Sequence, residues 1–235
     1  MEIQGVKQAN RFLFDKLRTA ADWHERTGIF MDFMSVKFQL HHWEEQTTLT
    51  ARNSIKNNYL FFLRCWMIDS NSISGAVLKR WVESRMGITP TFHKQRIRDI
   101  NSEAYFNYSI DVMQGSACTS AIQSQLDILF EYSQFELHRK YPGQDTITLY
   151  RGTHDAEEYD ILEDLGNRQQ IVRLNNLVSF TLEEERAWEF GRTVWKTIVP
   201  LAKIFFYNDL LPGSILKGED EYMIIGGDYR VERMR

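Results

Sequence analysis

The spacing of apolar and polar positions divides the chain into two parts. Before residue 142, apolar residues recur every three or four positions, which is the spacing of amphipathic helices. Pro90 is the only proline in this part, and Pro142-Gly143 then interrupts the pattern, because neither residue suits a helix interior. We therefore predict a helical half, residues 1–141, followed by a part of different structure, residues 142–235.

The clearest helix is predicted over residues 121–141. Its buried stripe consists of apolar residues at helical spacing, namely Ile122, Leu126, Leu129, Phe130 and Leu137. Ser120 and Gln123 have the spacing of a capping box, which marks the start of a helix. An earlier stripe with helical spacing consists of Ile55, Tyr59, Phe62, Leu63 and Trp66. We interpret the aromatic residues of both stripes as core residues.

Short runs rich in β-branched and aromatic residues, separated by turn residues, follow Pro142. The predicted strands span residues 146–150, 171–174, 177–180, 194–199, 204–207 and 222–225. A last run, residues 229–231, follows Gly226-Gly227-Asp228, which we interpret as a hairpin turn. The predicted fold class is α+β, with the helical half packed on a two-sheet β core (residues 142–235). The two parts can form one compact unit.

The composition narrows the class of protein. With 235 residues, of which 43% are hydrophobic and 13% aromatic, the chain can bury a large core. The formal net charge of −4 argues against binding to nucleic acid or to a membrane surface. Two cysteines give no disulfide framework, and the chain does not start with a signal segment. Apolar runs stop short of the ~20 residues that span a bilayer, so we predict a soluble cytoplasmic protein without a membrane span.

Three short motifs in the β core carry the candidate chemistry: Arg151-Gly152, Ser179-Phe180-Thr181 and Glu219-Asp220-Glu221. Since side chains on a strand alternate between faces, Glu219 and Glu221 are expected to project the same way. Two carboxylates at one place can divide labour, one stabilising a positive charge and the other handling a nucleophile. Each motif alone has a plainer interpretation, the triplet as a solvated acidic turn and Arg151 as half of a structural salt bridge.

The order arginine, Ser-x-Thr, Glu-x-Glu resembles the arginine–serine–glutamate class of mono-ADP-ribosyltransferases, which cleave NAD and transfer ADP-ribose to a protein. Within this class, the chain is similar to the NAD–dinitrogenase-reductase ADP-ribosyltransferase family, which switches off nitrogenase. The similar segments are residues 31–34, 75–85, 149–152, 175–181, 199–204, 210–213 and 219–227. They include parts of the helical half, which general ADP-ribosyltransferases do not share.

The resemblance implies NAD as a co-substrate and an ADP-ribosyltransferase-like β core. Arg151 would bind the phosphates, since a guanidinium pairs with phosphate oxygens in a bidentate manner. Gly152 would let the backbone approach the nicotinamide carboxamide. Ser179 would touch the nicotinamide riboside and position the catalytic glutamate. Phe190 matches a position where an aromatic ring often lies near the nicotinamide, although a core role suits it equally.

The same resemblance assigns roles to both glutamates. Glu221 matches the catalytic glutamate, which accepts a hydrogen bond from the ribose 2′-hydroxyl and stabilises the oxocarbenium-like charge. Glu219 matches the earlier member of the pair, and glutamate there accompanies arginine acceptors, which need a carboxylate to orient them and take up a proton. The chain departs from the class at Phe180 and Thr181, which replace threonine and serine. We interpret Thr181 with Glu184 as the capping box of the next helix.

Tyr207, Asn208 and Asp209 belong to a segment that looks like the family's substrate-recognition turn. The resemblance also implies two protein partners. Dinitrogenase reductase, the nitrogenase iron protein, would be modified on an arginine, and a PII-type nitrogen signal protein would act as regulator. The helical half contains none of the motif residues, so we assign it to recognition or regulation.

Two other functions remain compatible with the sequence: the same chemistry on another acceptor protein, and a non-catalytic module that binds NAD or another protein. No metal is expected, because His41-His42 with Glu44-Glu45 lacks the spacing of a zinc site. The sequence also has no G-x-G-x-x-G or P-loop motif, which argues against a dehydrogenase or an NTPase.

Overall fold

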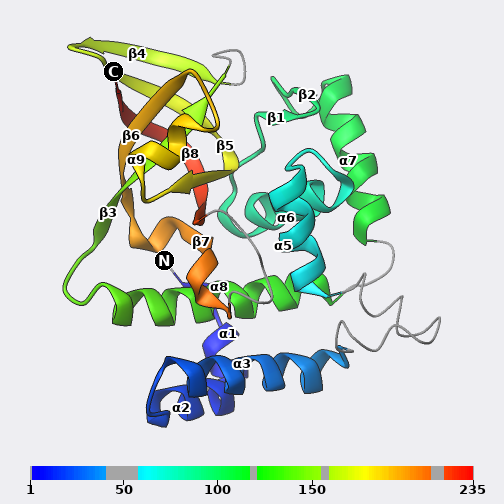
Figure 1. Ribbon diagram of the computed structural model, residues 1–235. Helices are drawn as coiled ribbons and strands as arrows, with labels where there is room; N and C mark the ends of the chain where they lie inside the picture. Colours follow the sequence, from blue (N-terminus) through cyan, green and yellow to red (C-terminus); the bar gives the residue numbers. More distant parts are fainter. Residues whose placement is uncertain (1, 41–57, 117–120, 155–158, 213–219, 235) are drawn as a thin grey trace.

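The computed structural model describes residues 2–40, 58–116, 121–154, 159–212 and 220–234 (Figure 1). Helices make up most of the described helical half, and the main sheet follows, which confirms the predicted α+β class. The helices there are α1 Val6–Ala9, α2 Arg11–Thr19, α3 Trp23–Phe38, α5 Tyr59–Ile68, α6 Ile73–Met86, α7 Glu103–Ser116 and α8 Ile122–Lys140. A short antiparallel pair that the sequence did not predict, β1 Phe92–His93 and β2 Gln95–Arg96, lies between α6 and α7.

Helix α8 forms where the apolar stripe predicts it and lies between the N-terminal helices and the sheet (Figure 1). Most of its residues are buried, because α8 contacts α1, α3 and α5 as well as the sheet. Two arginines of neighbouring helices bind its carboxylates in a bidentate manner, Arg85 to Asp127 at 2.7 and 2.9 Å and Arg26 to Glu136 at 2.6 and 3.0 Å. The N-cap is Ala121 and makes no side-chain capping bond, while Ser120 of the predicted capping box lies outside the described residues.

The β core contains β3 Thr146–Thr153, β4 Asp160–Gly166, β5 Gln169–Thr181, β6 Thr193–Pro200, β7 Ile204–Tyr207 and β8 Glu221–Arg233. Helix α9 Glu184–Trp188 follows β5, and the short 3-10 turns Leu201–Lys203 and Asn208–Leu210 flank β7. The antiparallel order is β4-β5-β3-β6-β8-β7, and β5 also pairs with β8. The strands of the predicted two-sheet core are therefore joined into one hydrogen-bonded network, in which β5, β3, β6 and β8 close a ring.

The predicted hairpin turn at Gly226-Gly227-Asp228 is wrong. Strand β8 runs straight through these residues, because β5 accompanies it from Gln169 opposite Glu232 to Thr181 opposite Glu221. The two predicted runs 171–174 and 177–180 are likewise one strand with a bulge, since β5 advances three residues from Leu174 to Leu177 while β8 advances two. Gly226 permits this bulge: a Cβ there would lie 1.7 Å from the carbonyl oxygen of Asn175. The glycines allow close backbone packing at this bulge instead of a chain reversal.

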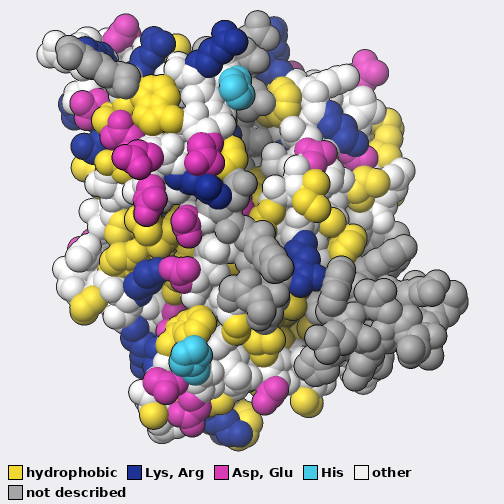
Figure 2. Space-filling model, viewed as in Figure 1, with side chains coloured by type: hydrophobic (Ala, Val, Ile, Leu, Met, Phe, Trp, Pro, Cys, Tyr) yellow, Lys and Arg dark blue, Asp and Glu magenta, His cyan; other side chains and the backbone are white. Residues whose placement is uncertain are grey.

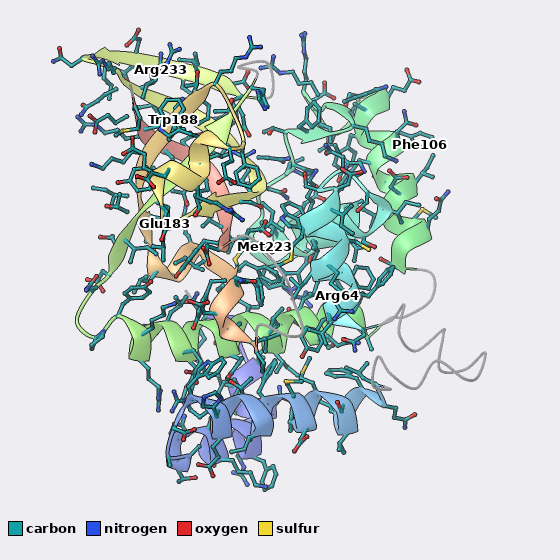
Figure 3. The ribbon with its side chains drawn as sticks, in the orientation of Figure 1. Arg64, Phe106, Glu183, Trp188, Met223 and Arg233 are labelled. Carbon is teal, nitrogen blue, oxygen red and sulfur yellow. The ribbon has the colours of Figure 1, made fainter. Side chains whose placement is uncertain are left out.

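The helical half and the β core share one buried apolar core, which contains residues of α5, α6 and α8 together with residues of β5, β7 and β8. Met223 of β8 is fully buried and faces the helices (Figure 3), and the rings of Trp81 and Phe205 lie 4.7 Å apart across the boundary. The bulge in β5 contributes polar contacts as well, because Asn176 donates to the carbonyls of Lys79 and Ile88 at 2.8 and 2.9 Å. The division at residue 142 marks a change of structure type, and the assignment of two domains to these parts stays a prediction.

Acidic and basic side chains are interspersed on the face seen in Figure 2, over both the helical half and the β core. Strand β4 lies at the edge of the sheet and is largely exposed, so it has no buried apolar pattern. That exposure explains why the sequence did not reveal it.

Candidate functional site

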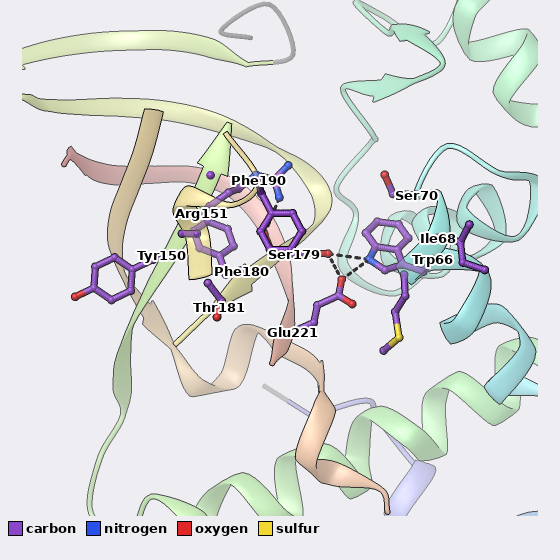
Figure 4. Close-up of a pocket in the computed structure, with 13 residues that line it drawn as sticks. Trp66, Ile68, Ser70, Tyr150, Arg151, Ser179, Phe180, Thr181, Phe190 and Glu221 are labelled. Atoms are coloured by element: carbon purple, nitrogen blue, oxygen red, sulfur yellow. Dashed lines mark hydrogen bonds between the residues drawn. The ribbon is translucent and has the colours of Figure 1, made fainter. Parts of the chain in front are cut away.

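A cavity of about 470 Å³ lies between the end of α5 and the β core (Figure 4), and we call it the first cavity. Its volume is in the range of small-molecule sites. The residues that line it come from both parts of the chain and are Trp66, Met67, Ile68, Ser70, Tyr150, Arg151, Gly152, Ser179, Phe180, Thr181, Ala187, Phe190 and Glu221. The fold thus brings the arginine motif, the serine motif and Glu221 to one place.

Strand register explains how Ser179 meets Glu221. Thr181 of β5 lies directly opposite Glu221 of β8, and Ser179 lies two residues earlier on the same face of β5. Ser179 is therefore the diagonal neighbour of Glu221. Its hydroxyl donates a short hydrogen bond to Oε1 of Glu221. The serine is thus placed to orient the carboxylate.

Arg151 lies on β3, opposite Trp195 of β6. Its Nη1 donates to the carbonyl oxygen of Ser179 at 2.7 Å, and its Nε and Nη2 donate to the hydroxyl of Tyr159 at 2.9 and 2.5 Å. The Tyr159 ring also lies 5.6 Å from the guanidinium carbon. These three bonds are made to neutral oxygens, and they fix the orientation of the guanidinium at the wall of the cavity. A guanidinium is the side chain whose fork matches phosphate oxygens.

Gly152 and Gly191 allow two backbone segments to touch. A Cβ on Gly152 would lie 2.0 Å from the carbonyl oxygen of Ala187, and a Cβ on Gly191 would lie 2.3 Å from the amide nitrogen of Thr153. The close approach at Gly152 is therefore to the chain's own backbone, and its approach to a nicotinamide stays a prediction. Phe190, beside this contact, is 44% exposed and lines the cavity, which excludes the alternative of a simple core residue.

The predicted capping box of Thr181 with Glu184 is wrong. The N-cap of α9 is Glu183, since Thr181 is still the last residue of β5. The Thr181 hydroxyl instead accepts a hydrogen bond from the amide of Glu183 at 3.3 Å, two residues later. This is the local turn that threonine favours, and it ends the strand beside the cavity.

Trp66 is a site residue that the sequence did not reveal. It was predicted as core and is indeed only 4% exposed, but its indole nitrogen reaches the motif residues. Nε1 lies 2.9 Å from Oγ of Ser179 and 3.1 Å from Oε1 of Glu221, and it donates to both (Figure 4). Helical spacing indicates that a tryptophan is buried and says nothing of its nitrogen. Only the packing of α5 against β5 and β8 shows this contact.

Glu219 lies outside the described residues. The expectation that it projects with Glu221 depended on a strand that includes all three acidic residues. Strand β8 begins at Glu221, and Asp220 before it has a φ of +43°, so the alternation of side chains along the described strand starts at Glu221. The role of Glu219 therefore stays a prediction from the resemblance.

Tyr207, Asn208 and Asp209 line a second cavity of about 480 Å³, with Trp23, Arg26, Glu136, Arg139, Lys140 and Leu211. Tyr207 is buried and stacks on Tyr222, with ring centroids 5.6 Å apart, and Tyr222 directly follows Glu221 in β8. Burial raises the pKa of both phenols, so they remain neutral. Asp209 is exposed and accepts from Lys140 at 2.9 Å. The turn is thus connected to the first cavity through Tyr222 and does not line it.

Within the described ranges, no three His, Cys, Asp or Glu side chains are grouped in a way that would hold a metal ion. Among the helices that the structure describes, none is long and apolar enough to cross a membrane.

Comparison with known proteins gives two matches. A family model described as "Dinitrogenase reductase ADP-ribosyltransferase (DRAT)" matches residues 1–233. The "NAD(+)--dinitrogen-reductase ADP-D-ribosyltransferase" of Rhodospirillum rubrum is 39% identical over 236 residues, which cover 99% of this chain and 86% of that relative. No solved structure matches the chain. Both matches extend over the helical half as well as the β core.

Proposed function

The chain belongs to the dinitrogenase reductase ADP-ribosyltransferase family, and from that premise we propose that it transfers ADP-ribose from NAD to an arginine of dinitrogenase reductase. The family predicted from the sequence is confirmed. The activity of this chain, its acceptor and its use of NAD are carried over from the relative's name and from the resemblance. The observation that supports them most is the convergence of Arg151, Ser179 and Glu221 on the first cavity.

The charges of the first cavity fit NAD. NAD has an anionic pyrophosphate and a cationic nicotinamide, and the cavity offers a guanidinium and a carboxylate. Arg151 would hold the phosphates, because its fork matches phosphate oxygens. The exposed ring of Phe190 would lie against the nicotinamide. The cavity therefore offers one partner for the pyrophosphate and one for the nicotinamide leaving group.

Glu221 would supply the main catalytic effect. Its carboxylate would accept a hydrogen bond from the ribose 2′-hydroxyl and place a negative charge where positive charge develops. Ser179 would hold this carboxylate in place, since its hydroxyl already donates to Oε1. Such an arrangement needs little reorganisation during the reaction.

Glu219 would orient the acceptor arginine and take up a proton from it. This assignment rests on the Glu-x-Glu motif alone. Asp209, which is exposed, and Asn208, which is half-buried beside it, would contact the iron protein, as the resemblance suggests. A PII-type nitrogen signal protein is proposed as regulator on the same basis.

Two alternatives stay open: the same chemistry on another acceptor protein, and a module that binds without catalysis. The hydrogen bond between Ser179 and Glu221 favours catalysis, because a module that only binds has no need of an oriented carboxylate.

Incubating the full chain with labelled NAD and purified dinitrogenase reductase tests the proposal. We expect label on the iron protein, on an arginine identified by mass spectrometry, and no label with Glu221→Gln. Agmatine, a small guanidine, serves as a second acceptor. Label on agmatine but not on the iron protein would favour another acceptor protein, and NAD binding without any cleavage would favour the non-catalytic module.

A further inference from the structure

We infer that Trp66 is a positioning residue for Glu221, so that the helical half completes the catalytic carboxylate of the β core. This inference rests on the proposed function, because it gives Trp66 a role in the reaction through Glu221. It assigns chemistry to the helical half beyond recognition or regulation.

The geometry of the contact carries the inference. An indole has one N–H donor and no acceptor, and that donor is shared between Oγ of Ser179 at 2.9 Å and Oε1 of Glu221 at 3.1 Å. The same Oε1 accepts from the Ser179 hydroxyl. Two donors from two different elements therefore fix one carboxylate oxygen. A side chain held from two sides has little freedom to leave the productive orientation.

The surroundings of Trp66 make it a rigid donor. Lys79 of α6 is fully buried, and its Nζ lies 5.8 Å from the centre of the Trp66 ring. That ammonium donates to Asn71 Oδ1 and to the carbonyl of Phe92, both at 3.0 Å. The start of α5 is held as well, because the amide of Tyr59 donates to Gln125 of α8 at 2.9 Å. The indole nitrogen is thus positioned by three helices and not by the sheet alone.

A buried tryptophan commonly finds some acceptor for its N–H, so the contact must be separated from ordinary burial. Trp81 gives the matched case. It is fully buried, and its indole donates to Asp127 at 2.8 Å, but this carboxylate is held by Arg85 at 2.7 and 2.9 Å and neither Trp81 nor Asp127 lines the first cavity. Trp66 and Trp81 therefore make the same type of bond at two places, one inside the candidate site and one outside it.

The experiment replaces Trp66 or Trp81, one at a time in the full chain, by benzothienylalanine. In this residue a sulfur atom stands where the indole has its N–H. If the transition state loses one hydrogen bond to a charged group, the rate of the reaction falls by roughly 10- to 100-fold. At position 66 we expect kcat for transfer and for NAD hydrolysis to fall by that factor. The Michaelis constant for NAD and the calorimetric NAD affinity should stay within about threefold, and the melting temperature should fall no further than at position 81, because the same type of bond is lost. At position 81 we expect a lower melting temperature and an unchanged kcat.

An unchanged kcat at position 66 would overturn the inference. So would a fall in kcat that is accompanied by a loss of NAD affinity of the same factor and by a melting temperature below that of the position-81 variant. A second measurement does not depend on activity. The indole N–H resonance of Trp66, assigned with Trp66→Phe, should shift in Glu221→Gln and in Ser179→Ala, while that of Trp81 stays in place. A Trp66 resonance that ignores both substitutions would also overturn the inference. If the wild-type chain cleaves no NAD but the Trp66 resonance still shifts in Glu221→Gln and Ser179→Ala, the proposed function is overturned. The contact between Trp66 and Glu221 is then still supported.

Discussion

The two walls of the first cavity are built by different physical means. On the β wall, Arg151, Ser179 and Glu221 stand at fixed positions on neighbouring strands, so strand register alone determines which side chains meet. On the helical wall, Trp66, Met67, Ile68 and Ser70 come from the end of α5 and the loop after it. Their position depends on how a helix packs on a sheet more than 100 residues later in the chain.

This difference has a consequence for function. The β wall contains the charged groups, and the helical wall contributes apolar surface, one indole donor and the hydroxyl of Ser70. Substitutions on the β wall should therefore change the chemistry itself. Substitutions on the helical wall should change how well the chemistry is positioned or which acceptor reaches it.

The largest effect is expected on the β wall from Glu221→Gln. The substitution keeps the size of the side chain and removes the charge beside the ribose, which typically costs roughly 10²- to 10³-fold or more. Transfer and NAD hydrolysis should both be lost, while NAD still binds by calorimetry. Glu232→Gln, at an exposed position of the same strand, is the matched control and should behave as wild type. Activity of Glu221→Gln within a few-fold of wild type would contradict the assignment.

The next-largest effect is expected from Glu219→Gln, and it distinguishes the role of Glu219 from that of Glu221. Cleavage by water needs only the charge beside the ribose, whereas transfer needs the acceptor arginine held in line and relieved of a proton. Glu219→Gln should therefore lose most modification of the iron protein and keep measurable NAD hydrolysis. Both rates are to be measured on one preparation. If they fall by the same factor, Glu219 acts on the ribose or on folding, and arginine specificity cannot be inferred from it.

Arg151→Lys should act on binding. Lysine keeps the charge but loses the fork that donates to Tyr159 and Ser179. We expect a rise of roughly tenfold or more in the Michaelis constant for NAD, as for the loss of one charge-assisted hydrogen bond, in a protein that remains folded. Arg173→Lys is the control, because Arg173 also lies on a strand and binds Asp228 through a bidentate pair at 2.7 and 3.0 Å, away from the cavity. Unchanged NAD affinity in Arg151→Lys would return Arg151 to a purely structural role.

The same contrast between the walls explains what the sequence could predict. Helical spacing predicted α5 and α8, and runs of β-branched residues located most strands. The motif resemblance named Arg151, Ser179 and Glu221, which the fold brings together. These features are local in the sequence, or they belong to a pattern that a family shares.

Two of the missed features depend on distant partners. The hairpin at Gly226 was predicted because glycine pairs are typical of turns, but the long pairing with β5 keeps the chain extended there. Trp66 was correctly predicted as buried, yet nothing in its spacing indicates that its nitrogen faces Ser179. A fragment that starts near residue 142 lacks Trp66, so we expect it to hydrolyse NAD much more slowly than the full chain.

The smallest effect is expected at the mouth of the helical wall. Ile68 is the last residue of α5, is 86% exposed and lines the first cavity, so an approaching acceptor protein would meet it there. Replacing Ile68 therefore tests whether the helical wall contributes to recognition of the acceptor protein. Ile68→Ser removes apolar surface of one side chain, and a single contact outside the centre of an interface typically contributes about 1 kcal/mol or less. We expect the Michaelis constant for the iron protein to rise by roughly threefold to fivefold, which is that energy expressed as a ratio.

Hydrolysis of NAD by Ile68→Ser should stay at the wild-type rate, because the substitution leaves Trp66 and the β wall unchanged. Val36→Ser is the matched control: Val36 is 81% exposed on α3 and does not line the cavity, so its loss should alter neither rate. If both serine variants weaken iron-protein modification equally, the effect comes from the general surface and not from the cavity mouth. If Ile68→Ser slows hydrolysis as much as transfer, the end of α5 serves the chemistry through Trp66, and acceptor recognition must be sought elsewhere.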